Sequence, residues 1–455
     1  MGNLLTSILN AGNSLQAFGQ ALNVTTNNVG NSQTAGYARQ TATFLALPFD
    51  PSTGYPGGVM AGPVQSSRNA LAEQAVRQQQ TSLGFSQQKA LDLGVVEPLF
   101  DPSSQTGISA SLNNFFSSFS ALSINPNDAT ARQTVLTAAT QLAQAFQTAS
   151  NGLANQQTSV NSEIQGSLAQ INQLAAQIAQ LNGQRQSSGG QGADAGVDAS
   201  MYSALEQLSQ FGGVTALEQS DGSVSVYLNG QTPLVFGNQS FALQGDFSAP
   251  QARILDSQGQ DVTATVTAGT LGAELDTRNN TLPSYLASLN SLAQNLADQV
   301  NTTLSQGVDV NGSAPVNNLF TYGSSATAAQ TISVNPLITP DQIAAALPSA
   351  PGGNGNALAL SALANAVGAN GSTFTQTYAA LGAQVGQDIS TATANETTGQ
   401  QLVTQAQSIR SQLSGVSLDQ EAANLIQYQR SYQAASQMIS VINSMTATLL
   451  NMLSS

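Results

Sequence analysis

The chain has 455 residues, which is long enough for several domains at about 150 residues each. Charged residues make up only 7% of it, against about 25% in a typical folded protein, while its hydrophobic fraction of 41% is ordinary. Acidic groups outnumber basic ones by 24 to 10, and Lys89 is the single lysine. This balance excludes the basic surfaces that bind nucleic acid or anionic membranes.

The chain contains no cysteine, no histidine and no tryptophan. Zinc sites and imidazole-dependent catalysis are therefore excluded, and we expect no catalytic, cofactor or metal site. The first cationic residue is Arg39, so the N-terminus lacks the positive start of a secretory signal peptide. No apolar run approaches the roughly 20 residues of a membrane span, and we expect no membrane insertion.

Both ends of the chain carry a heptad repeat of apolar residues, which is typical of helices that pair as a coiled coil. A lone amphipathic helix gains little stability in water, so the apolar stripe of each helix needs a partner helix. The alternative is two ordinary surface helices packed on a globular core. The predicted interface residues are Leu4, Ile8, Leu15, Phe18, Leu22 and Val29 at the N-terminal end, and Leu418, Leu425, Tyr428, Tyr432, Ile439, Ile442 and Leu449 at the C-terminal end.

Turn-forming residues between Asn27 and Gly36 are expected to end the first helix. An extended linker rich in proline and glycine is predicted over 37–62. Ser417 and Gln420 form a capping box that starts the last helix.

The middle of the chain is predicted to be a bundle of long helices interrupted by a small β-rich region. Apolar periodicity indicates helices over 71–99, 109–122, 129–181, 282–304 and 374–413, with Gly152 and Gly166 as weak points of the third. A Gly- and Ser-rich linker is expected over 184–200. Asn229-Gly230 indicates a hairpin. Further strands are expected over 234–236, 241–243, 252–255 and 262–266.

The predicted fold is mainly α with a small inserted β domain, in which the terminal helices pair as a coiled coil. Residues 1–65 with 414–455 would form an inner terminal coiled-coil domain with its extended linker. Residues 66–213 with 276–413 would form the helical bundle domain, loop-rich over 305–355. Residues 214–275 would form the β-rich outer domain.

Two segments resemble the flagellar rod, hook and hook-associated axial protein superfamily. The first is 27–40, whose signature residues are Asn27, Asn31, Thr34, Gly36 and Tyr37; the second is 415–434. Between them, Asn125-Pro126 and Ala131-Arg132-Gln133 resemble the helical domain of the hook-associated protein 1 family rather than hook protein, flagellin or the second junction protein.

The resemblance implies a structural subunit of the bacterial flagellum at the hook–filament junction, exported by a type III route and located outside the cell. Its implied partners are further copies of itself in an axial ring, hook protein, the second hook-associated junction protein and an export chaperone.

Two other functions are weighed against this one. A secreted helical adhesin or translocator would also have helical termini. A carboxylate-pair glycosidase would have to use Asp194, Asp198, Glu206 and Asp221, which lie in a predicted linker, a short helix and a hairpin turn with no aromatic sugar platform nearby.

Overall fold

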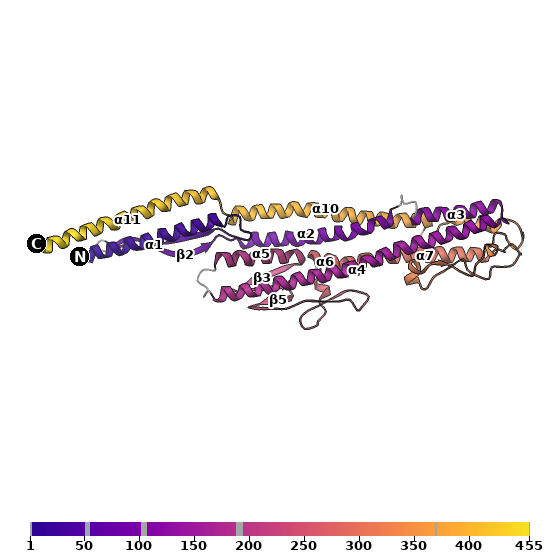
Figure 1. The fold of residues 1–455 in the computed structure, drawn as a ribbon, viewed down its shortest axis with the longest axis horizontal. Helices are drawn as coiled ribbons and strands as arrows, with labels where there is room; N and C mark the ends of the chain where they lie inside the picture. Colours follow the sequence, from indigo (N-terminus) through magenta and orange to yellow (C-terminus); the bar gives the residue numbers. More distant parts are fainter. Residues whose placement is uncertain (1, 51–54, 102–106, 188–193, 369–370, 455) are drawn as a thin grey trace.

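A computed structural model describes residues 2–50, 55–101, 107–187, 194–368 and 371–454. The molecule is a long rod with both termini at the same end (Figure 1). At that end α1 (Gly2–Gly30) and α11 (Leu418–Ser454) lie side by side. The expected pairing of the terminal helices is confirmed.

The segment expected to be an extended linker is a β-hairpin, so that expectation is wrong. Strands β1 (Gln40–Asp50) and β2 (Tyr55–Ser66) pair antiparallel, from Gln40 opposite Ser66 to Asp50 opposite Tyr55. The hairpin lies along α1, where Asn10 Nδ2 donates to Gly57 O at 2.7 Å. Prolines and glycines weaken the strand pattern in the sequence, but this ladder and the contact with α1 outweigh them.

The rest of the rod is a bundle built around α4 (Ala129–Ser187), a helix of 59 residues that spans about 90 Å. It continues through Gly152 and Gly166, which were expected to weaken it. At Gly152 a Cβ would lie 2.6 Å from Leu99 Cδ1, so the glycine makes room for that leucine. The other long helices are α2 (Ala70–Val96), α3 (Ile108–Ile124), α5 (Ala195–Phe211), α7 (Leu282–Ser305) and α10 (Phe374–Ser414); the short ones are α6 (Gly269–Asp276), α8 (Ala328–Thr331) and α9 (Gly355–Ala362).

The expected linker over 184–200 is also shorter than predicted. Helix α4 extends to Ser187 and α5 begins at Ala195, where the Asp194 side chain accepts a hydrogen bond from Gly196 N at 2.8 Å. Residues 188–193 lie outside the described part of the chain.

The β-rich region forms small antiparallel sheets against α4. One has the order β3-β4-β5-β6 and another pairs β7 with β8. The expected strand at 241–243 lies instead at 244–246, and the one at 262–266 is a 3₁₀ turn over Thr263–Thr265. Asp261 Oδ1 accepts from Thr263 N at 2.9 Å and holds the chain in that turn. The strands are β3 (Val214–Glu218), β4 (Val224–Leu228), β5 (Thr232–Phe236), β6 (Gln239–Ser240), β7 (Gln244–Asp246) and β8 (Arg253–Leu255), and a separate pair is β9 (Phe320–Thr321) with β10 (Ser333–Val334).

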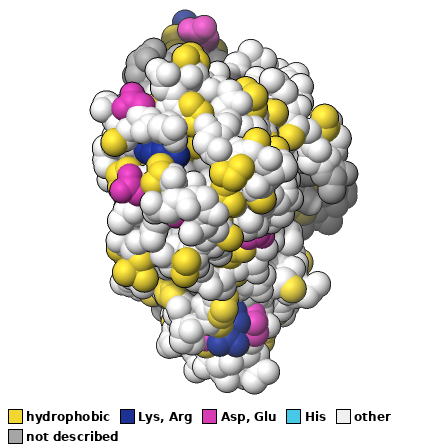
Figure 2. All heavy atoms as spheres, turned by 90° about the vertical axis from the view of Figure 1, so that its right-hand side faces the viewer, with side chains coloured by type: hydrophobic (Ala, Val, Ile, Leu, Met, Phe, Trp, Pro, Cys, Tyr) yellow, Lys and Arg dark blue, Asp and Glu magenta, His cyan; other side chains and the backbone are white. Residues whose placement is uncertain are grey.

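One continuous hydrophobic core extends from Leu93 to Val385 and includes Val226 and Leu234 of the sheet. The β-rich region therefore shares its core with α4, and the division at 213 and 275 stays a prediction. The end of the rod opposite the termini shows few charged side chains among uncharged polar and apolar ones (Figure 2).

Candidate assembly interface

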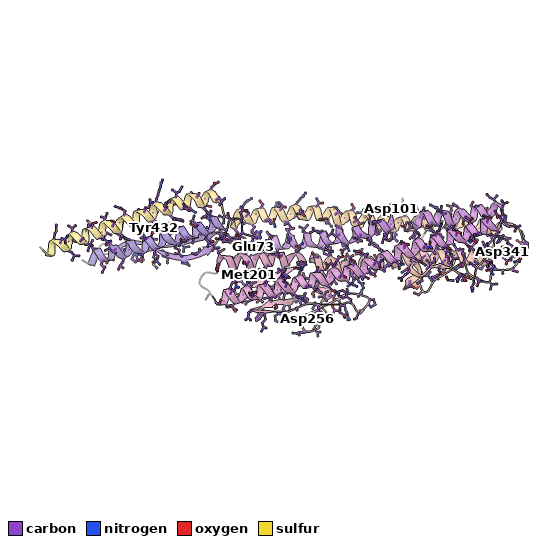
Figure 3. The ribbon with its side chains drawn as sticks, viewed as in Figure 1. Glu73, Asp101, Met201, Asp256, Asp341 and Tyr432 are labelled. Atoms are coloured by element: carbon purple, nitrogen blue, oxygen red, sulfur yellow. The ribbon has the colours of Figure 1, made fainter. Side chains whose placement is uncertain are left out.

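The terminal module, which we define as 1–66 with 415–455, is held together by an aromatic cluster. Phe44 of β1 lies 5.7 Å from Phe18 of α1 and 5.9 Å from Tyr428 of α11, measured between ring centroids. Figure 3 places Tyr432 on the side of α11 that faces α1, where a Cβ at Gly19 would be 3.7 Å from its Cε2. Phe18 and Tyr428 were predicted as interface residues, whereas Phe44, which contacts both of them, was not.

Small residues make up most of the buried apolar positions where α1 packs against α11 and the hairpin. Ala11, Ala17 and Ala21 of α1 are buried, as are Ala435 and Ile442 of α11. Alanines let the helix backbones approach closely, but they bury little apolar surface. The predicted large residues border this contact: Leu4, Ile8, Leu15, Phe18, Leu22, Leu425, Tyr428 and Ile439 are half-buried, and Val29, Leu418, Tyr432 and Leu449 are exposed.

Large apolar side chains remain in water along this module. Leu5 and Leu9 are 63% and 60% exposed, Phe49 is 73% exposed, and Met445 is 57% exposed. Roughly half of the exposed large apolar residues in the described chain belong to the module, which is less than a quarter of the sequence. A concentration of exposed apolar side chains is typical of a surface that binds another protein.

A buried polar network closes the base of the helix pair. Asn28 Nδ2 donates to Gln40 O at 2.8 Å and to Glu421 Oε2 at 3.2 Å. Asn28 Oδ1 accepts from Tyr37 OH and from Gln40 N, both at 2.9 Å. Arg39 Nε donates to Glu421 Oε1 at 2.8 Å. One asparagine therefore links α1, the hairpin and α11.

Burial and the nearby Glu421 carboxylate raise the pKa of Tyr37 to about 12. The Tyr37 hydroxyl consequently stays protonated at neutral pH and can donate to Asn28 Oδ1.

A second cluster, of ion pairs, lies at the end of the body that adjoins the module. Arg68 bonds Glu73 at 2.6 Å and Asp198 at 2.8 Å, and Arg410 bonds Glu206 at 2.6 Å. Figure 3 shows Glu73 where the terminal helices meet the bundle. In a chain with so few charges, ion pairs are concentrated at this joint.

The signature residues lie in the loop that reaches this joint. Asn31 Nδ2 donates to Asn27 O at 3.0 Å and Thr34 Oγ1 donates to Asn31 Oδ1 at 3.1 Å, which closes the end of α1. Gly36 has a φ of 73°, and a Cβ there would lie 2.3 Å from Ala199 O of α5. Its carbonyl accepts from Arg68 Nη2 at 2.7 Å.

Sequence analysis missed Asn28, Arg39 and Glu421 as site residues, although a signal was present. Residues 1–38 contain no charge at all, and Arg39 is the first. A lone cation in an uncharged segment needs a partner when it is half-buried, and the acids near the start of α11 were the available ones.

The glycosidase candidates all have structural contacts. Asp198 and Glu206 pair with Arg68 and Arg410, Asp194 caps α5, and Asp221 Oδ1 accepts from Ser223 N at 3.0 Å in a turn. Within the ranges that the structure describes, no group of three or more acidic side chains is arranged to hold a metal ion. None of the described helices is both long and apolar enough to cross a membrane.

Comparisons with known proteins agree with this architecture. The family model for the C-terminal region of flagellar basal body rod proteins matches residues 410–452, which cover most of α11. The last helix is thus similar to the C-terminal region of flagellar rod proteins. The model for the helical domain of the flagellar hook-associated protein FlgK matches residues 93–320, half of the chain. The chain belongs to the FlgK family.

Two relatives that match this chain over nearly their whole length are both named flagellar hook-associated protein 1. Flagellar hook-associated protein 1 of Bacillus subtilis is 26% identical, over 96% of each chain. That of Salmonella typhimurium is 26% identical over 99% of this chain and 100% of its own. The solved structure of the flagellar hook junction protein FlgK from Burkholderia pseudomallei has a TM-score of 0.65 at 19% identity, and covers 74% of this chain and 99% of that one. This structural likeness supports the fold described above.

Proposed function

We propose that this chain is a structural subunit of the hook–filament junction and that it polymerises through α1 and α11. The observation that carries this proposal is the large apolar surface left in water on the terminal module. Burying apolar surface stabilises association by about 25 cal/mol per Å². A molecule that keeps such a surface on one end of a rod is suited to end-to-end or ring-like packing.

The shape of the module supports packing between copies. A groove of about 560 Å³ lies between α1, the hairpin and α11, with Ala11, Ala434 and Ala435 among its lining residues. Small residues make the recess, and bulky exposed residues such as Leu9 and Phe49 are available on the same module. A recess and a protrusion at different places on one chain define a head-to-tail interface, which generates rings or filaments.

The remaining parts of the proposal follow from the family. The subunit would contact hook protein on one side and the second hook-associated junction protein on the other. It would leave the cell by type III export with the help of a chaperone, and would act outside the cell without catalysis. The ion-paired or capping roles of Asp194, Asp198, Glu206 and Asp221 support a structural function over a glycosidase.

Deletion of the gene tests the proposal directly. The mutant should assemble hooks without filaments and release flagellin into the medium, and the full-length gene should restore filaments. Electron microscopy of the cells and blotting of the medium are the measurements. Normal filaments in the mutant would refute the proposal and favour the adhesin.

A further inference from the structure

Three carboxyl groups converge where α2, α4 and α6 pack together. Asp92 and Glu274 are each only 2% exposed, and Glu163 is half-buried. Gln88 Nε2 donates to Asp92 Oδ1 at 2.7 Å and to Glu163 Oε2 at 2.8 Å. A single amide nitrogen therefore holds two carboxyl groups within a few ångströms of each other.

No cation among the described residues neutralises this cluster. Lys89, the nearest on α2, bonds Asp276 and Thr281 instead. Arg278, in the turn after α6, donates to Asn161 Oδ1 at 2.8 Å and to Pro250 O at 3.1 Å.

The elements packed around the cluster carry further acids, and their arginines bond other groups. Helix α10 carries Asp388 and Glu396, and the 3₁₀ turn after α2 carries Glu97. The other arginines of the body interact with groups outside the cluster. Arg410 pairs with Glu206 and Glu73, and Arg77 lies near the same two acids. Arg185 pairs with Glu218, Arg253 pairs with Asp246, and Arg132 donates to backbone carbonyls.

Two oxygens of the cluster lack a donor. Asp92 Oδ2 and Glu274 Oε2 are buried without a hydrogen-bond partner in the described structure, and so is the Thr277 hydroxyl. An ionised carboxylate can only accept hydrogen bonds, and burying it unpaired is costly. A bound proton removes the charge and turns one oxygen into a donor, which can bond a facing carboxylate.

We propose that the folded body holds two protons on this cluster, one on Asp92 and one on Glu274. Their loss as the pH rises weakens the packing of α2, α4 and α6. The subunit is thereby most stable in mild acid, although it contains no histidine.

The direction of the pKa changes agrees with this geometry. Burial and, second to it, the adjoining Glu163 carboxyl raise the pKa of Asp92 to about 7, against the lowering effect of the Gln88 and Thr277 side chains. Burial raises the pKa of Glu274 to about 8, against the opposing bond from Ser167. Because both values are raised above those of the unfolded chain, the stabilisation is complete below about pH 4 and is lost as the pH rises toward 7 to 8.

Unfolding of the full-length chain, measured by denaturant titration at a series of pH values, tests the proposal. Between about pH 5 and pH 7 the unfolding equilibrium constant should rise by up to tenfold per pH unit for each retained proton. The side chains introduced by Asp92→Asn and Glu274→Gln stay neutral at every pH. Each variant should therefore lose the tenfold rise per pH unit that comes from one retained proton. The control Asp261→Asn changes an exposed acid and should keep the wild-type slope.

Two results would overturn the proposal. The first is a variant pair whose slopes equal that of the wild type, because the pH dependence would then come from general charge repulsion. The second is an infrared spectrum of the folded protein at about pH 6 that lacks a protonated-carboxyl band, or one whose band persists in the double variant. Should the double variant fail to fold, the wild-type spectrum still tests the proposal, because a missing protonated-carboxyl band at about pH 6 would overturn it.

Discussion

Single residues decide how the terminal module is attached to the body, and Gly36 has the least room for change. Its φ of 73° and the 2.3 Å approach of Ala199 O to a Cβ leave no space for a side chain. Sequence reasoning identified Gly36 as a turn residue, since glycine is common in turns. It could not identify the contact with α5, because that contact joins segments more than 160 residues apart.

Replacing Gly36 by alanine should strain the joint by about 1–3 kcal/mol, because the backbone must shift to relieve the clash. The expected result is faster hydrogen exchange at the Arg39 amide, which donates to Ser414 O at 2.9 Å. Gly30→Ala is the control, since a Cβ there meets nothing within 4 Å. Equal exchange in the two variants would mean that the loop is not fixed against α5.

At the scale of elements, the heptad periodicity predicted α1 and α11 and their pairing, but only some of the buried side chains. The predicted Ile442 is buried, whereas the structure also buries Ala17 and Ala21 and leaves the predicted Val29 exposed. Periodicity reports the apolar face of a helix, and the partner decides which part of that face is covered. The hairpin was missed for a related reason, since its strands gain stability from α1, which no local pattern records.

Two substitutions in α11 should separate pairing from assembly. Ile442 is 8% exposed and Met445 is 57% exposed. Ile442→Asp removes a contact of about 1.5–3 kcal/mol and buries a charge, so it should lengthen the distance between spin labels on cysteines introduced at Gln16 and Gln433. Met445→Asp should leave that distance unchanged yet abolish filament formation. Ser440→Asp, at an exposed polar position, should change neither.

A different pattern would reject this assignment. If Met445→Asp cells swim normally while Ile442→Asp cells do not, the exposed face takes no part in assembly. Only the contact between α1 and α11 within the subunit would then matter.

At the scale of the whole molecule, the rod is a body with a continuous core and a terminal module that adds nothing to it. The core cluster begins at Leu93 and ends at Val385. The chain passes between the two parts only around Ser67 and Gly415. Hydrogen bonds cross this joint, from Ser67 N to Arg39 O at 2.8 Å and from Arg68 Nη2 to Gly36 O at 2.7 Å. Turn and capping signals in the sequence favoured a domain boundary at 65 and 414, and that division stays a prediction.

Removal of 1–66 and 415–455 should therefore leave the body folded. The thermal midpoint should change by less than about 4 °C, because the lost contacts are polar and partly exposed and are together worth about 1 kcal/mol. Circular dichroism and calorimetry are the measurements. A control chain that lacks 1–66 and everything after Val385 also loses the rest of α10, including Val403 and Ala406, which are buried. Its midpoint should fall by much more. If the two truncations lower the thermal midpoint by the same amount, the terminal module and the body form one cooperative unit, and the prediction is wrong.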